Sequence, residues 1–256
     1  FRLSKYFYLS LVFFLNLNVF PADSFIYNNF NNHGSVGQIN IPTARFFDES
    51  SYGFTIYDGT PDQKITMTSY PFDWMEASFF YTDIQNRAYC EVDFDPVCNQ
   101  TYKDKGFNFK IRLKEEGVWP SLAIGINDIA GTGLYSSEYI VGSYGINKTD
   151  LHFGLGWGQL NGSSRNFKNP LGKLEDSFFD RPSGTEDQGG QFQPSRYFSG
   201  ETVSPFFGVT HALNDKYLLK LEYDTTKAPG LIGYEEAKND LSFGIDFSLS
   251  KNFTIG

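Results

Sequence analysis

The chain has 256 residues, of which 18% are aromatic and 20% are charged, and its formal net charge is −9. The negative charge disfavours binding to nucleic-acid phosphates, and the sequence has no basic cluster suited to anionic lipid headgroups. The aromatic excess, together with 25 glycines, is typical of β-barrels that carry aromatic residues at their rims.

The N-terminus has the pattern of a secretory signal. Arg2 and Lys5 precede an apolar run over residues 6–20, and small residues follow at 22–24. We therefore predict that residues 1–24 are a cleaved signal peptide; the alternative is a buried first element of the domain. No cysteine directly follows the apolar run, so the pattern does not indicate lipidation.

The chain contains two cysteines, Cys90 and Cys98, which flank an acidic loop. A neighbouring pair in an exported protein usually forms a disulfide, and we predict that bond here. Two thiols without neighbouring histidines do not make a zinc site. We predict no cofactor.

Residues 25–51 form a lead-in to the first regular strand. The stretch 25–35 is rich in asparagine, and in 37–45 the residues Gly37 and Pro42 interrupt a regular strand ladder. We predict that 37–45 lies inside a barrel mouth, as a candidate plug, or along the periplasmic rim.

From residue 52 onward the sequence alternates between apolar and polar residues. In 107–114, for example, apolar residues take every second position. Because successive side chains of a strand point to opposite sides, each strand has one apolar and one polar face. The pattern predicts strands over 52–58, 63–69, 73–83, 106–114, 119–127, 136–146, 149–159, 203–212, 216–225, 239–249 and from 252 onward.

The connections between these strands alternate in length. Tight polar turns are predicted at 70–72, 115–118, 147–148, 213–215 and 250–251, and wide connections at 84–105, 128–135, 160–202 and 226–238. Outer-membrane barrels have this asymmetry, with short periplasmic turns and long outer loops. Counting 37–45 as a wall strand would put the long loops on the wrong side.

A closed antiparallel barrel needs its last strand to pair with its first. The last predicted strand begins only at Asn252, and the sequence ends at Gly256. We therefore expect 52–256 to be a partial barrel of about ten to twelve strands, incomplete at the C-terminus. The first residue is Phe1 rather than methionine, so we expect the true start to be missing as well.

The polar faces of the strands carry charges of both signs. These charges predict ion pairs that stabilise a lumen, and the alternative is a polar path along which a sugar chain slides. The candidate lumen residues are Glu76, Lys110, Arg112, His152, Lys216, Lys220, Glu222 and Asp246.

The wide connection 160–202 combines aromatic and charged residues. We expect it to fold inward as a plug or cap; the alternative is contact with a glycan, because aromatic rings stack on sugars and guanidinium groups bind hydroxyls. The candidate contact residues are Phe178, Phe179, Arg181, Phe192, Arg196, Tyr197 and Phe198.

No catalytic motif is recognisable. The histidines His33, His152 and His211 lie in unrelated stretches, and the adjacent Glu115 and Glu116 diverge in a tight turn. We predict no enzyme activity, no catalytic residues and no metal ligands.

Three stretches together resemble a known family. GQINIPTAR (37–45), PFDWMEASFFYTDI (71–84) and the segment 104–145 are similar to YjbH-type outer-membrane proteins linked to bacterial exopolysaccharide production. The resemblance covers about residues 34–250. It implies a larger barrel of which this chain is a part, and it implies no catalytic residues.

These observations predict an all-β, antiparallel transmembrane β-barrel with meander topology, in the outer membrane of a Gram-negative bacterium. We expect a non-enzymatic role in exopolysaccharide export or assembly. Its partners would be outer-membrane lipid, polysaccharide and other components of an export system. The alternatives are a porin-like channel for small solutes and a secreted β-sandwich that binds carbohydrate.

Overall fold

The computed structural model describes residues 28–90, 100–162, 165–184, 190–227 and 240–256. The predicted signal peptide, residues 1–24, and Cys98 lie outside the described residues. Cys90 is disulfide-bonded.

The described residues form one antiparallel sheet of twelve strands. Strands that follow one another in the chain are neighbours in the sheet, except that β8 pairs only with β9, so the topology is a meander. The strands are β1 (Tyr52–Asp58), β2 (Asp62–Phe72), β3 (Met75–Ala88), β4 (Thr101–Lys114), β5 (Ser121–Ile129), β6 (Ser137–Ile146), β7 (Thr149–Gly158), β8 (Phe167–Lys168), β9 (Thr202–Ala212), β10 (Tyr217–Tyr223), β11 (Leu241–Ser250) and β12 (Phe253–Ile255).

The all-β meander predicted from the sequence is therefore confirmed, with local differences in the strand bounds: for example, β2 continues to Phe72, so the turn predicted at 70–72 lies at 73–74. The connection predicted at 84–105 is shorter, because β3 continues to Ala88 and β4 already begins at Thr101. A further difference is β8, a two-residue strand that is too short to give a pattern of its own.

Helical structure among the described residues is confined to one connection. It consists of three 3-10 helices, η1 (Pro170–Lys173), η2 (Asp176–Phe179) and η3 (Pro194–Arg196). Within the described ranges, no helix is long and apolar enough to cross a membrane.

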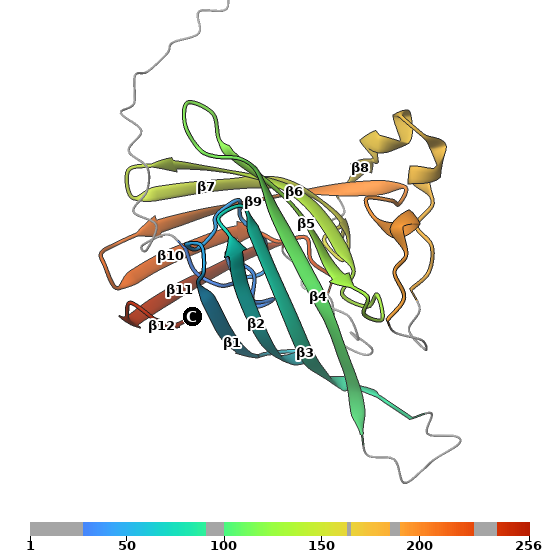
Figure 1. Ribbon diagram of the computed structural model, residues 1–256, viewed down its shortest axis with the longest axis horizontal. Coiled ribbons are helices and arrows are strands. Elements are labelled where there is room, and N and C mark those ends of the chain that lie inside the picture. Colours follow the sequence, from blue (N-terminus) through green and yellow to red (C-terminus); the bar gives the residue numbers. More distant parts are fainter. Residues whose placement is uncertain (1–27, 91–99, 163–164, 185–189, 228–239) are drawn as a thin grey trace, which may run out of the picture.

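The sheet is strongly curved, and the segment that precedes β1 lies inside the curve (Figure 1). Strands β1 and β12 are the two ends of the strand order, and no pairing between them is present among the described residues. The sheet is thus curved without being closed. We call residues 28–47 the inner segment.

The two faces of the sheet have opposite polarity. In β2, Thr66 and Thr68 are 1% and 3% exposed on the inner face, whereas Met67 between them is 62% exposed on the outer face. Residues that are paired directly across neighbouring strands lie on the same face, so the pairing extends the apolar outer face and the polar inner face over the sheet. Exposed apolar side chains of the outer face include Phe54, Ile56, Ile65, Met67, Phe79, Tyr81, Phe107, Ile111, Ile140, Phe153, Phe207, Leu221, Phe243 and Ile245.

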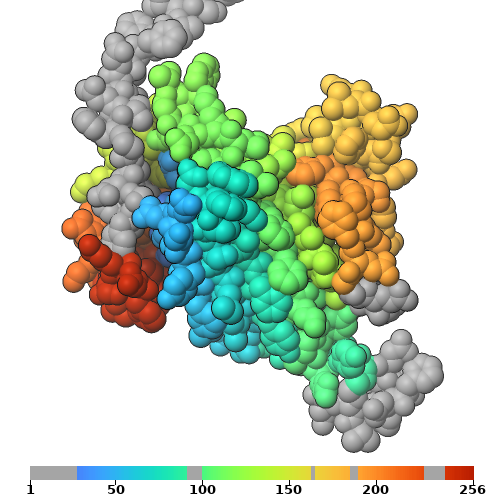
Figure 2. All heavy atoms as spheres, in the orientation of Figure 1, coloured from blue at the N-terminus to red at the C-terminus, as the bar shows by residue number. Residues whose placement is uncertain are grey.

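The outer surface over β2 to β4 is not covered by any other described element in Figure 2. The apolar core instead lies on the inner face, where the inner segment meets the sheet. Its buried members are Val36, Ile41, Ala44, Phe46, Tyr70, Ala123, Tyr139, Val141, Leu160 and Phe206.

Close approach between the inner segment and β2 depends on Gly34. This residue has a φ of +75°, and a Cβ at its position would collide with Thr66. Only glycine adopts this conformation readily and also leaves room for the neighbouring strand.

The ends of the sheet differ in the length of their connections. Tight turns at 73–74, 147–148 and 251–252 lie at one end, which we call the short-turn end. The connections 130–136, 159–201 and 224–240 lie at the other, the long-loop end. This asymmetry follows the predicted pattern.

Candidate functional site

Charged side chains of the sheet hold the backbone of the inner segment. The carboxylate of Glu222, fully buried on β10, accepts hydrogen bonds from three consecutive backbone N–H groups, those of Ile39 (3.0 Å), Asn40 (3.0 Å) and Ile41 (3.3 Å). Three charge-assisted bonds to one carboxylate fix the position of this turn.

Two buried lysines hold backbone carbonyl groups of the same segment. Lys220 Nζ donates to the Gln38 carbonyl (3.0 Å) and pairs with Asp246 (2.5 Å). Lys110 Nζ donates to the carbonyls of Val36 (3.2 Å) and Arg45 (2.9 Å). These ammonium groups therefore satisfy carbonyls that have been removed from water.

Glu76 compensates the charge of Lys110 and binds the inner segment directly. Its carboxylate lies 2.9 Å from Lys110 Nζ and accepts hydrogen bonds from Tyr70 Oη (2.8 Å) and Val36 N (3.2 Å). Ser35 Oγ donates to the same carboxylate. All these groups are buried, so the pair is shielded from solvent.

Arg45 anchors the end of the inner segment at the short-turn end of the sheet. Its guanidinium makes two hydrogen bonds to Asp150 (2.7 and 2.6 Å) and one to Glu116 (2.6 Å). Burial alone disfavours the charged form, but Asp150 and Glu116 outweigh it and raise the pKa of Arg45. The guanidinium is therefore a permanent cation at this contact.

His152 joins two further contacts between the sheet and the inner segment. Its ring nitrogens lie 2.8 Å from Ser143 Oγ and 3.2 Å from Thr210 Oγ1. Ser143 Oγ accepts from Ala44 N (2.9 Å), and Thr210 Oγ1 accepts from Gln38 Nε2 (2.7 Å). His152 thus positions the hydroxyls that bind the segment.

The predicted lumen residues consequently separate into three groups. Glu76, Lys110, His152, Lys220, Glu222 and Asp246 lie buried on the inner face, at or next to the contacts with the inner segment. Arg112 lies at the rim, where it pairs with Glu115 (3.2 Å) and covers the Phe46 ring (4.7 Å). Lys216 is exposed in the turn before β10 and does not face the inner side, because the strand alternation begins only at Tyr217.

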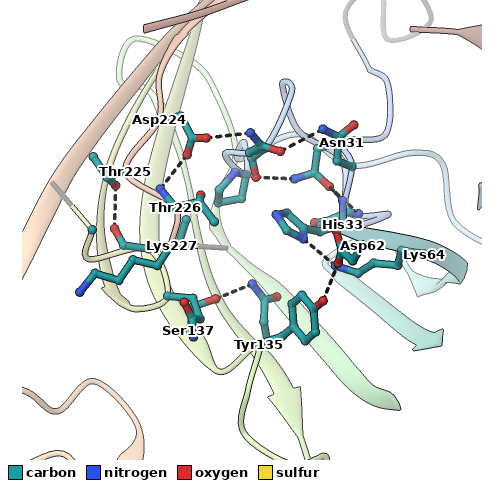
Figure 3. A pocket seen from close by; sticks show the side chains of 18 of the residues that line it. Asn31, His33, Asp62, Lys64, Tyr135, Ser137, Asp224, Thr225, Thr226 and Lys227 are labelled. Carbon is teal, nitrogen blue, oxygen red and sulfur yellow. Dashed lines mark hydrogen bonds and ion pairs between the residues drawn. The ribbon is translucent and has the colours of Figure 1, made fainter. Parts of the chain in front are cut away.

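A cavity of about 690 Å³ lies between the inner segment and the long-loop end of the sheet. Figure 3 shows His33, Asp62, Lys64 and Tyr135 on one side of it and Asp224, Thr225, Thr226 and Lys227 on the other. Side-chain amides form much of the remaining lining, from Asn31, Asn32, Asn40, Asn108, Asn127 and Gln159. We call this cavity the vestibule.

A polar network closes one side of the vestibule. Lys64 Nζ lies 3.4 Å from Asp62, 3.1 Å from His33 Nδ1 and 4.0 Å from the centre of the Tyr135 ring. Burial and the adjacent ammonium lower the pKa of His33 to about 3, so its imidazole is neutral at neutral pH. Tyr135 Oη donates to Asp62 (2.5 Å), which completes the network.

Little in the sequence indicates this network. The strand pattern does not predict that Asp62 pairs with Lys64, and it places Tyr135 only in a wide connection. The asparagine-rich stretch 25–35 is the one signal, because clustered side-chain amides are suited to the wall of a polar cavity.

The long connection 159–201 begins against the inner segment at Leu160, but its part with the 3-10 helices stands to the side of the sheet (Figure 1). Of this connection, the described residues 165–184 and 190–201 contribute nothing to the lining of the vestibule. The sequence predicts that this connection folds inward as a plug or cap, with 37–45 as a second candidate plug. The inner face is filled by residues 28–47, which include 37–45. Among the candidate contact residues, Phe192 is exposed and packs near Tyr197, with ring centres 5.7 Å apart.

Other aromatic residues of this connection pack within it or against the sheet. The Phe198 ring meets Trp157 edge-on at 5.2 Å, and Phe179 lies beneath Lys168 Nζ at 4.4 Å. The Phe178 carbonyl accepts from Asn169 Nδ2 (3.0 Å). These contacts give the connection its own structure.

Arg181 fastens this connection to the sheet. Its guanidinium makes two hydrogen bonds to the buried carboxylate of Glu138 on β6 (2.7 and 3.0 Å) and one to Ser136 Oγ (2.9 Å). It also donates to the Arg196 carbonyl (3.0 Å), and Arg196 in turn donates to the Gly133 carbonyl (3.1 Å). Both predicted arginines therefore serve as internal anchors.

Replacing Arg181 by alanine is expected to release the connection, because Glu138 would remain buried without its cation. Proteinase K should then cleave within residues 165–198 about tenfold faster while the sheet stays intact, since local opening governs cleavage. Lys173→Ala, which removes an exposed cation from the same connection, is the matched control. Equal cleavage of the two variants would contradict the anchoring role.

Comparison with known proteins identifies the family. A family model described as exopolysaccharide biosynthesis protein YbjH matches residues 29–256. The uncharacterized lipoprotein YjbH of Escherichia coli (strain K12) is 39% identical over 193 residues, which are 75% of this chain and 27% of that relative. The chain thus spans little more than a quarter of the relative's length, and it belongs to the YjbH family.

Proposed function

We propose that this chain forms part of the wall of an outer-membrane β-barrel that takes part in exopolysaccharide export or assembly without catalysing a reaction. The observation that carries the proposal is the polarity of the sheet: apolar side chains face outward across the strands, and charged ones face inward. Lipid favours this arrangement, whereas water would favour the reverse.

Two alternatives are less well supported. A secreted β-sandwich would pack its apolar sheet faces on each other, but here the apolar face is exposed along β1–β4 and β9–β11. A porin-like channel needs an open lumen, but the inner segment occupies the inner face. Filling of that face supports a barrel that is closed at rest.

The family description supports the link to exopolysaccharide, and the relative's description as a lipoprotein supports a location in the cell envelope. The non-enzymatic role is supported by the use of the buried charges, which hold the inner segment in place. The partners in this proposal are outer-membrane lipid, a polysaccharide and other components of an export system.

An arginine on the outer face tests the proposal. Leu221→Arg on β10 would place a charge in the hydrocarbon region, where it costs about 2–4 kcal/mol near the bilayer midplane. We expect this variant to be lost from the outer-membrane fraction and to leave a gene-deletion strain without surface polysaccharide. The control is Leu174→Arg in the long connection, where Leu174 is already exposed outside the sheet. In the deletion strain, this variant should reach the wild-type level in the outer-membrane fraction and restore surface polysaccharide.

Recovery of the wild-type protein as a soluble, folded monomer without detergent would contradict the membrane proposal. Wild-type levels of surface polysaccharide in the deletion strain would contradict the proposed role in export or assembly.

A further inference from the structure

We propose that the vestibule is a binding site for a neutral, hydroxyl-rich saccharide that enters from the long-loop end. This inference rests on the proposed function and specifies the chemistry of the ligand. It is carried by the lining of the cavity, its charge and its closed floor.

The lining offers many groups that bind hydroxyls. Of the six side-chain amides, that of Asn31 is fully used within the inner segment, and the other five keep donor or acceptor capacity. The hydroxyls of Ser137, Thr225 and Ser242 add groups of either kind. Gln159 Oε1 and Thr226 Oγ1 are buried with no hydrogen-bond partner among the described residues. Such atoms are normally satisfied, so a polar occupant would complete the site.

Tyr57 supplies an aromatic surface for a sugar ring. It lies on the inner face of β1, lines the vestibule and is only half-buried. The rings of Phe80 and Tyr135 pack edge-on against each other at 5.5 Å, and Lys64 covers Tyr135. Tyr57 is therefore the ring best placed to stack on a ligand.

The charge of the vestibule favours a neutral ligand over an anionic one. Among the described residues, its lining contains the carboxylates of Asp62, Asp224 and Asp240 but only two lysines and no arginine. Lys64 is already held by Asp62 and His33, and Lys227 is exposed at the edge of the lining. Carboxylates therefore outnumber ammonium groups in the described lining, and a sugar carboxylate that gave up its water there would meet net repulsion.

The inner segment forms the floor of the site. Asn31, Asn32, Asn40 and Pro42 line the cavity from that side, and Asn40 Nδ2 donates to Asp224 (2.7 Å) across it. Since the segment is held by buried charges, the vestibule is a closed pocket rather than an open passage. A saccharide would bind there without threading through.

The test is isothermal titration calorimetry on the full chain in detergent micelles. The neutral probes are cellohexaose, maltohexaose and mannohexaose, and the anionic probe is hexagalacturonate. We expect at least one neutral probe to bind and to bind more tightly than the anionic one. Absence of binding by all neutral probes, or equal or tighter binding of hexagalacturonate, would overturn the proposal.

Two variants locate the binding. Tyr57→Ala and Gln159→Ala should each weaken the neutral probe by about tenfold, since a lost stacking or hydrogen-bond contact is worth about 1–1.5 kcal/mol. Tyr52→Ala removes a tyrosine from the outer face of the same strand and should bind like the wild type. Unchanged binding by both pocket variants, with circular dichroism unchanged, would overturn the site.

The two experiments distinguish failure of the saccharide site from failure of the proposed function. A deletion strain that lacks surface polysaccharide alongside a protein that binds no neutral probe would overturn the site and leave the export role standing. Binding by the protein alongside normal polysaccharide in the deletion strain would support the site and overturn the export role.

Discussion

In the proposed barrel, deletion of residues 28–47 is expected to open a path that conducts ions across planar lipid bilayers. The inner segment fills the inner face of the sheet with buried side chains such as Val36, Gln38 and Ile41. Its removal would leave the charged side chains that now hold it, including Lys110 and Glu222, facing an open space. Those side chains would take up water, because a buried charge without a partner is strongly disfavoured.

The matched control is deletion of residues 170–179, which comprise η1 and η2 and contribute nothing to the vestibule lining. This deletion should leave the bilayer current at the wild-type level. Glu222→Gln, which keeps the shape of the side chain but removes its charge, should give brief openings because three N–H contacts are weakened. If the wild type and the variant that lacks residues 28–47 gave the same low current, the inner segment would not be what closes the barrel.

The strands could be predicted from the sequence because their signal is local. The alternation of apolar and polar residues in β2 or β4 is visible within a few residues, and it also shows which side chains share a face. The sequence therefore predicted that Glu76 and Lys110 face the same side. Their pairing depends on the register of β3 against β4, which places the two residues directly opposite each other.

The contacts of the inner segment could not be predicted, because they join residues far apart in the chain. Glu222 binds backbone N–H groups about 180 positions earlier, and a backbone N–H has no sequence signature. For the same reason the sequence offers two candidate plugs, 37–45 and the long connection 160–202, and does not decide between them. The segment that fills the inner face is held mainly through its backbone.

The boundary of a strand also limited the prediction of inner-face residues. Lys216 and Lys220 are an even number of positions apart, so the alternation along a strand predicts that both lie on the polar face. Strand β10 begins only at Tyr217, and Asn214 Oδ1 accepts from the N–H of Lys216 to form a turn. Alternation has meaning only within the strand, so Lys220 points inward and Lys216 points to solvent.

Lys110→Met is expected to destabilise the folded protein by about 3–5 kcal/mol, because it breaks a buried ion pair and leaves one charge behind. The side chains of Lys110 and Glu76 are only 1% and 4% exposed, and their charged atoms lie 2.9 Å apart. The substitution also removes the donor to the Val36 and Arg45 carbonyls. The loss would be measured by urea unfolding in lipid vesicles, followed by tryptophan fluorescence.

The matched control lies on the same strand. Lys103 pairs with Asp83 at 2.8 Å, but these side chains are 40% and 31% exposed, so Lys103→Met should cost only about 0–1 kcal/mol. The double variant Glu76→Gln with Lys110→Met should recover part of the loss, because no unpaired carboxylate then remains buried. Equal effects of the substitutions at Lys110 and Lys103 would mean that the inner face is hydrated and that the inner segment does not seal it.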